Sequence, residues 1–281
     1  MRMKTNYPRI ANRIYRQPWA ILPSMHESIR RQFEAHIAKG AKADMPNDSD
    51  LTEDQNETQP QATNGIGIIP IYGVLGSKLG LMETMCGGVD VEDVGEQLKA
   101  FRDNPDIACI LLDIASPGGC VTGIPELAQL ISDCDKVKPV YAYSSDQTCS
   151  AAYWLASQAR AFVVSPSSSI GSVGCYIYLE DHTRELEIAG VKPNPIVSES
   201  SPLKLAGADF KPLTDTERAM FQADVDGMYT QFVGAINAKR QCNAEFLKGQ
   251  VVDGTKAVEV GLADGLANDM EEMLTILATA K

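Results

Sequence analysis

The chain has 281 residues, of which 44% are hydrophobic and 22% charged, and this balance excludes a wholly disordered or fibrous protein. Its 25 Lys and Arg stand against 37 Asp and Glu, so the net charge of −12 argues against nucleic acid as a main partner. The seven cysteines include no C-x-x-C pair, so we expect a reducing compartment and no zinc site. We also expect no other metal and no cofactor.

Two further absences concern membranes and export. No stretch approaches the roughly 20 consecutive apolar residues that a membrane span needs. The N-terminal residues also lack the order of a charged segment followed by an apolar one that is typical of a signal peptide. We therefore expect a soluble, cytoplasmic protein.

Charge divides the chain into three segments. Residues 1–42 carry nine Lys or Arg and two Glu, which predicts a basic N-terminal arm. Within this arm, apolar residues recur every four positions from Met25 to Ile37, as in a short amphipathic helix. Residues 43–65 carry six acids, no base and few large apolar residues, which is typical of a mobile linker. Residues 66–281 form the body.

In the body, short apolar runs alternate with helical patterns. Such alternation predicts an α/β fold with a largely parallel sheet and helices on its faces. The expected strands cover 66–75, 107–115, 139–143, 161–164, 176–179 and 194–197. The expected helices lie near 91–102, 123–134, 150–159 and 181–189, and a long helix follows from Thr214, with Glu217 at the capping-box position.

Two segments of the body have features of a catalytic site. Residues 116–119, Ser-Pro-Gly-Gly, follow a strand, and adjacent glycines can turn backbone N–H groups into a cavity as an oxyanion hole requires. Ser150 begins a helix of small residues directly after a strand, where a nucleophile can be presented. Each pattern alone also fits an ordinary turn or helix cap. Cys149 is a weaker candidate nucleophile, because no neighbouring histidine would form its thiolate.

An activated serine needs a base. His26 and His36 lie in the arm, so a histidine base would have to be His182. A lysine can replace histidine where burial lowers its pKa from about 10.4 towards neutrality. Lys204, beside Leu203 and Leu205, has the most apolar sequence neighbours among the lysines.

Five motifs follow one another between about residues 66 and 268: SPGG, CSAAYW, SIGSVG, KLAGADFKPLTDTER and VVDGTKAVEVGLAD. In this order they resemble the signal-peptide-peptidase-type serine proteases, which use a Ser/Lys dyad. The resemblance implies the fold shared by the Clp protease and the crotonases, built from repeated β-β-α units.

The same resemblance implies roles for individual residues. Ser150 would be the nucleophile, Lys204 the general base and Ser172 the residue whose hydroxyl orients the lysine. The backbone N–H groups of Gly119 and Ala151 would form the oxyanion hole. The chain departs from the family pattern after the nucleophile, where the usual two glycines are replaced by alanines.

The arm, linker and protease body together resemble the head-maturation (prohead) proteases of tailed phages. This implies a homo-oligomeric serine endopeptidase that cleaves scaffold or head proteins during capsid assembly, in the host cytoplasm or inside the prohead. The alternatives are a cytoplasmic signal-peptide-peptidase-like enzyme that degrades peptides, a crotonase-type enzyme acting on acyl-CoA esters, and a non-catalytic assembly protein with a protease fold. The sequence leaves open whether one subunit or two complete the dyad.

Overall fold

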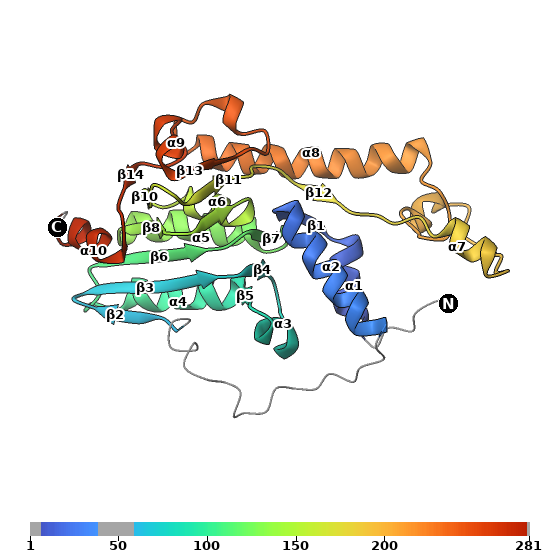
Figure 1. Ribbon diagram of the computed structural model, residues 1–281, viewed down its shortest axis with the longest axis horizontal. Coiled ribbons are helices and arrows are strands. Elements are labelled where there is room, and N and C mark those ends of the chain that lie inside the picture. The colour runs from blue at the N-terminus through green and yellow to red at the C-terminus, as the bar shows by residue number, and fades with distance from the viewer. Residues whose placement is uncertain (1–6, 39–58, 280–281) are drawn as a thin grey trace.

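The computed structural model describes residues 7–38 and 59–279, and it confirms the α/β class. Its largest sheet has six strands in the order β14-β10-β8-β6-β3-β2 and is parallel except for β2 (Figure 1). Runs of Ile, Leu and Val form its central strands, as expected for strands covered on both faces. The strands are β2 (Gln61–Thr63), β3 (Ile66–Tyr72), β6 (Cys109–Ala115), β8 (Val140–Ser144), β10 (Ala161–Val164) and β14 (Gly265–Leu266).

Helices cover both faces of this sheet. On one face the main core joins the sheet to α4 (Val91–Asp103), α5 (Ile124–Val137), α6 (Ala151–Ala156) and α8 (Asp215–Asn237). On the other face, α10 (Met270–Thr279) buries Met273 and Leu277 in a smaller cluster. The expected capping box of α8 is present, since the side chain of Thr214 accepts from the N–H of Glu217 and that of Glu217 accepts from the N–H of Thr214.

A second sheet joins the N-terminal arm to the body. Its five strands run in the order β12-β1-β7-β4-β5, and the arm supplies β1, which lies between β12 and β7 (Figure 1). The strands are β1 (Pro18–Ile21), β4 (Val74–Gly76), β5 (Gly88–Asp90), β7 (Gly118–Cys120) and β12 (Tyr176–Ile177). The arm also forms α1 (Pro8–Arg16) and the amphipathic helix expected near Met25–Ile37, which is α2 (Pro23–Ala38).

A third, smaller sheet has the strand order β13-β11-β9. Its strands are β9 (Gln147–Cys149), β11 (Ser169–Gly171) and β13 (Val251–Asp253). The chain thus repeats a unit in which a strand of the large sheet, a short strand of a neighbouring sheet and a helix follow one another, as in β6-β7-α5 and β8-β9-α6. These are the expected β-β-α units.

The expected strand at 194–197 is wrong: these residues have no regular structure, and Ile196 is 97% exposed. Pro193 and Pro195 lack the N–H groups that a sheet needs. Residues 43–58 of the expected mobile linker (43–65) lie outside the described residues, while 61–63 pair with β3.

The segment between β12 and α8 extends away from the sheets. It carries α7 (Thr183–Ile188) and a short 3₁₀ helix, η3 (Pro202–Leu205). Figure 1 shows α7 beyond the end of α8 that lies farther from α6. The remaining short helices are α3 (Leu81–Met85), η4 (Ala244–Phe246) and α9 (Gly254–Glu259). Among the described helices, none combines the length and apolar character needed to span a membrane.

Candidate active site

Two neighbouring strands of the small sheet each end at a serine singled out in the sequence. β9 leads into Ser150 and β11 leads into Ser172, and the two strands are parallel, with Cys149 opposite Gly171. The backbone N–H of Ser150 donates to the carbonyl of Gly171 at 2.7 Å. The structure therefore brings Ser150 and Ser172 to the same edge of one sheet.

Both serines have a left-handed backbone. Ser150 and Ser172 each have a φ of 54°, and they are two of the four non-glycine residues with positive φ among the described residues. A residue with a Cβ adopts this conformation at a cost of about 1 kcal/mol or more. Such strain persists only where the surrounding structure enforces it, and it is typical of functional sites.

Ser150 is enclosed by the protein. Its residue is 1% exposed, and its hydroxyl donates to the carbonyl of Gly174 at 3.3 Å. α6 begins at the next residue, Ala151, so the backbone N–H of Ala151 lies directly beside the nucleophile position. Serine is thus held at a sharp turn between a strand and a helix.

The glycine turn after β6 packs against the start of α6. A Cβ added to Gly118 would lie 3.1 Å from the backbone nitrogen of Ala151. A Cβ added to Gly119 would lie only 2.0 Å from the carbonyl oxygen of Leu75, so this position has no room for a side chain. The two glycines therefore let β7 approach both β4 and Ser150, as the sequence interpretation of an oxyanion hole requires.

Lys204 is not part of this arrangement within one chain. It lies exposed on η3, in the segment that extends away from the sheets, so the apolar setting expected for its side chain is absent. In the described part of the chain, no hydrogen bond joins its amine to Ser150 or Ser172. The structure of a single chain thus brings together four of the five predicted site residues and leaves Lys204 apart.

The other candidate groups have structural partners of their own. Burial raises the pKa of the Cys149 thiol to about 12, which removes it as a nucleophile at neutral pH. His182 is held between the carboxylates of Glu180 and Glu185, at 2.9 and 3.0 Å. Partial burial lowers the pKa of His182, but the bonds to these two carboxylates outweigh it and raise the pKa overall.

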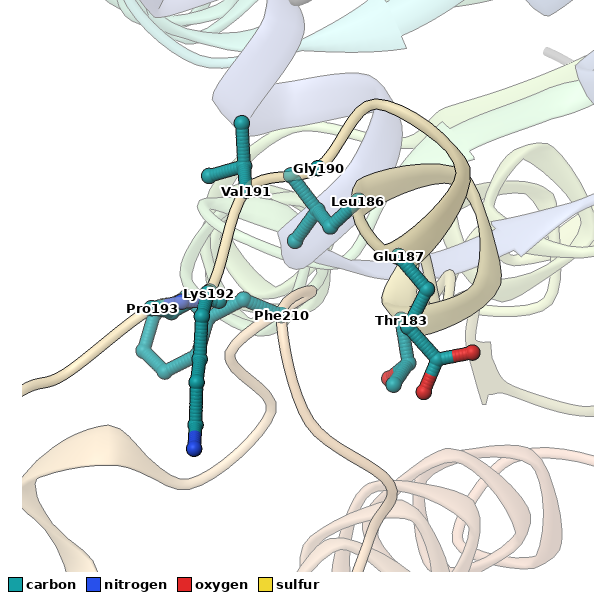
Figure 2. Close-up of a pocket in the computed structure, with 8 residues that line it drawn as sticks. All are labelled: Thr183, Leu186, Glu187, Gly190, Val191, Lys192, Pro193 and Phe210. Atoms are coloured by element: carbon teal, nitrogen blue, oxygen red, sulfur yellow. The ribbon is translucent and has the colours of Figure 1, made fainter.

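A hollow elsewhere on the chain is separate from the two serines. Figure 2 shows it around α7, where Leu186 and Phe210 contribute apolar walls and Lys192 lies at the rim; its volume is about 370 Å³. Among the described residues, no group of three or more His, Cys, Asp or Glu side chains gathers as a metal site would require.

One feature beside the site was missed in the sequence. β1 pairs with β7, so the residues Trp19, Ala20 and Ile21 lie against the glycine turn. The run Trp-Ala-Ile-Leu between two prolines was the available signal, but a four-residue run does not identify a strand or its distant partner.

Comparison with known proteins identifies the family of the chain. Residues 132–281 match the model of Peptidase family S49. The chain is 26% identical to the Capsid assembly protease C of Escherichia phage lambda, over 98% of this chain and 66% of that protein. It is 30% identical to the Head-tail preconnector protein GP5 of Enterobacteria phage P21, over 78% of this chain and 44% of that protein. The chain therefore spans about two thirds of the length of the lambda protein and less than half of the length of the P21 protein.

Among solved structures, a ClpP1 mutant from Listeria monocytogenes matches with a TM-score of 0.45 and 16% identity. This match covers 73% of this chain and 94% of that one. The family match covers more than half of the chain and includes Ser150, Ser172 and Lys204. The chain belongs to Peptidase family S49.

Proposed function

We propose that this protein is a serine endopeptidase in which Ser150 is the nucleophile and Lys204 the general base. The observation that carries the proposal is the left-handed backbone of Ser150, a buried serine held at a strand-to-helix turn beside the N–H of Ala151 and the Gly118-Gly119 turn. A structural serine has no need of this strained conformation, whereas a nucleophile presented to an oxyanion hole does.

The reaction is acyl transfer to water. The neutral amine of Lys204 takes the proton of Ser150 Oγ as this oxygen forms a bond to the peptide carbonyl carbon. The N–H groups of Gly119 and Ala151 stabilise the oxyanion, the C–N bond breaks, and the lysine ammonium gives its proton to the leaving amine. Water then attacks the acyl-enzyme, losing a proton to Lys204, and Ser150 regains its proton when the acid product leaves. Ser172 holds the lysine amine in line by a hydrogen bond.

In this proposal, Lys204 serves the Ser150 of a neighbouring copy of the chain. Two observations support this arrangement: Lys204 is exposed on a segment that extends from the body, and the same segment exposes large apolar side chains. These are Ile188, Val191, Ile196 and Leu203. Burial of this surface against a second copy would remove water from around the lysine amine and favour its neutral form, as a general base requires.

The proposed substrates are scaffold or head proteins of a phage capsid, cleaved in the host cytoplasm or inside the prohead. The names of the two phage relatives support this choice. Two protein substrates distinguish a capsid protease from a general peptidase. A capsid protease would cleave a capsid scaffold protein at a few sites and would degrade casein more slowly than the scaffold protein.

The test compares casein turnover by the wild-type protein with that of Ser150→Ala and Lys204→Ala. Each substitution should abolish turnover, whereas Ser157→Ala, a buried serine at the end of α6, and Lys248→Ala, an exposed lysine paired with Glu245, should retain it. Full activity of Lys204→Ala would overturn the dyad. Absence of any acyl-enzyme in the wild-type protein, assayed by intact mass with capsid scaffold supplied, would favour a non-catalytic assembly protein.

A mixing experiment tests the shared dyad. In a mixed closed oligomer of Ser150→Ala and Lys204→Ala chains, about a quarter of the sites would combine an intact serine with an intact lysine. Activity should therefore recover to about that fraction of wild type when the two inactive variants are unfolded together and refolded. No recovery, with both variants oligomeric, would assign both groups to one chain.

A further inference from the structure

A four-residue strand of the N-terminal arm fills a slot beside the candidate site. β1 is antiparallel to β7 on one side, with Ala20 opposite Gly119, and to β12 on the other, with Trp19 opposite Tyr176. Without β1, β7 and β12 would each present an unpaired backbone edge to the slot. Such edges bind extended peptides by adding them as strands.

The backbone register brings a carbonyl of β1 to the oxyanion-hole residues. The N–H of Val121 donates to the carbonyl of Pro18 at 3.1 Å, and the N–H of Leu22 donates to that of Pro117 at 3.0 Å. Hydrogen-bonded pairs alternate with non-hydrogen-bonded pairs along an antiparallel ladder. The pair of Ala20 and Gly119 lies midway between these two bonds, so it is also a hydrogen-bonded pair. The carbonyl of Ala20 therefore faces the N–H of Gly119, which is the donor that a scissile carbonyl would use.

A second contact supports this placement. The carbonyl oxygen of Ala20 lies 2.2 Å from the point where a Cβ on Gly118 would stand, and the backbone nitrogen of Ala151 lies 3.1 Å from the same point. The carbonyl of Ala20 and the backbone nitrogen of Ala151 therefore both lie beside Gly118.

The arm also closes the route to the nucleophile. Ala20 is fully buried, Trp19 and Ile21 are each 2% exposed, and Ser150 is 1% exposed. A peptide cannot reach Ser150 through this slot while β1 occupies it, because the backbone edges that would hold the peptide are already paired.

The side chains of β1 indicate what the slot accepts. Ala20 belongs to the main core cluster with Leu75 and Ala151, whereas Trp19 and Ile21 lie in the separate cluster that includes Met25 of α2. Successive side chains of a strand point to opposite faces, so the position opposite Gly119 faces the body and holds only a methyl group. A peptide in the same register would need a small residue at that position.

In addition to its buried apolar side chains, the arm makes polar contacts on both sides of the slot. Arg13 forms an ion pair with Glu83 at 2.9 Å, on the side of β4. Arg30 lies 3.7 Å from Glu180, on the side of β12, and its guanidinium stands over the ring of Tyr178. These contacts and the apolar cluster around Trp19 hold the arm in place without a covalent bond, so its release would be reversible.

We propose that β1 is a built-in occupant of the slot between β7 and β12, where an extended peptide substrate would bind, and that it keeps the enzyme latent until the arm leaves. This inference rests on the proposed peptidase function and adds to it the regulation of that site. The substrate class is an extended peptide with a small residue opposite Gly119.

A reversible lock tests the proposal in the full-length chain. Trp19 and Cys120 face each other at a non-hydrogen-bonded pair, where Cα atoms are about 4.5 Å apart, within the range of a disulfide. Trp19→Cys should therefore form a disulfide with Cys120 on oxidation and prevent release of the arm. Casein turnover should fall at least about tenfold on oxidation and return on reduction, because the fraction of open enzyme sets apparent activity.

The matched control carries Trp19→Cys together with Cys120→Ser, so it loses the same tryptophan but cannot form this bond. Its turnover should be the same before and after oxidation. The proposal is overturned if the crosslinked protein, verified by intact mass, cleaves casein as fast as its reduced form.

A binding assay separates this proposal from the peptidase function. The probe is a fluorescent peptide with the sequence of residues 17–22, Gln-Pro-Trp-Ala-Ile-Leu, measured by anisotropy in a Ser150→Ala background. It should bind the reduced Trp19→Cys protein and not the oxidised one. If no protein with Ser150 intact is catalytic but the peptide still binds only the reduced protein, the peptidase function is wrong and occupation of the slot by β1 is supported. Equal binding of the peptide to the reduced and oxidised proteins overturns occupation of the slot by β1.

A release variant gives the opposite effect. Ile21→Asp places a carboxylate in the apolar cluster around Trp19 and should expel β1. Peptide affinity and casein turnover should both rise relative to wild type, with an unchanged far-ultraviolet circular dichroism spectrum for the body. Unchanged affinity and turnover, with β1 released as judged by Trp19 emission, would contradict the proposal.

Discussion

The N–H of Ser150 donates a hydrogen bond to the carbonyl of Gly171, the residue directly before Ser172. This bond extends the pairing of β9 with β11 by one residue and couples the positions of the two serines. A displacement of either strand end therefore moves both hydroxyl groups, which makes the small sheet the scaffold of the site.

Ser172→Ala should reduce kcat by about 10²-fold and leave KM nearly unchanged, because in the proposed mechanism this hydroxyl orients the general base and does not hold the substrate. The pH profile of kcat should shift as well, since the lysine loses a hydrogen-bond partner. Ser168→Ala, which removes a buried hydroxyl bonded to the carbonyl of Ser165, is the control and should retain activity. Wild-type kinetics for Ser172→Ala would exclude a role for this hydroxyl.

Gly119→Ala should abolish turnover and lower the free energy of unfolding by about 1–3 kcal/mol, because the added methyl group meets the backbone of β4. Gly234→Ala in α8 is the matched control: nothing lies within 4 Å of its added Cβ. Gly234→Ala should raise the free energy of unfolding by up to about 1 kcal/mol, because alanine is a better helix former than glycine. Urea denaturation measures the stability of the two variants, and casein assays measure their turnover. A stable and active Gly119→Ala protein would contradict the close approach of Gly119 to β4.

Docking of the arm should weaken as the pH falls below the ordinary value of 6.5 for His26. Burial lowers the pKa of this imidazole, and nearby Arg30 adds to the effect, while the carbonyl of Ile14 and the carboxylate of Glu27 oppose it. The released arm then binds a proton that the docked arm does not, so docking is strongest above pH 6.5 and declines towards the lowered pKa.

Trp19 reports this change, since its ring lies 4.9 Å from that of His26. Its emission, followed in a Trp154→Phe background, should shift to longer wavelength in acid. His26→Gln should remove most of this pH dependence, whereas His182→Gln should not. The same transition in His26→Gln as in the parent would assign it to another group.

Phe232→Ala should lower the free energy of unfolding by about 3–5 kcal/mol, and Phe232→Leu by less. The ring of Phe232 is fully buried and stacks on that of Trp154 at 4.5 Å, so it fixes α6 against α8. Chemical denaturation measures the loss, with Val137→Ala, at a 73% exposed position, as a control within about 0.5 kcal/mol of wild type. Equal stability of Phe232→Ala and wild type would contradict this packing.

The sequence predicted the central sheet well, because its strands are apolar runs such as 107–115 that need no knowledge of their partners. It predicted the start of α8 for a similar reason, since Thr214 and Glu217 form a local motif. The strands of the two smaller sheets were harder to predict. β7 and β9 have three residues each and include glycine or polar side chains, and their pairing depends on segments far apart in the chain.

In the candidate site, too, features with a local sequence motif were predicted and features that depend on distant segments were not. Ser150, Ser172 and the glycine turn were found from motifs, and the structure brings them together. The backbone strain of the serines and the position of β1 have no local signature in the sequence. The exposure of Lys204 was not predicted, because apolar neighbours along the chain do not bury a side chain unless another element covers them.

The small sheet also determines when the site can exist during synthesis. Ser172 donates its N–H to the carbonyl of Gln250, and β11 lies between β9 and β13 (Val251–Asp253). The ribosome makes Ser150 long before it makes β13, so the nascent chain carries this serine without the strand that completes the sheet. In the proposed function, a chain would therefore begin to cleave its substrates only after translation has passed Asp253.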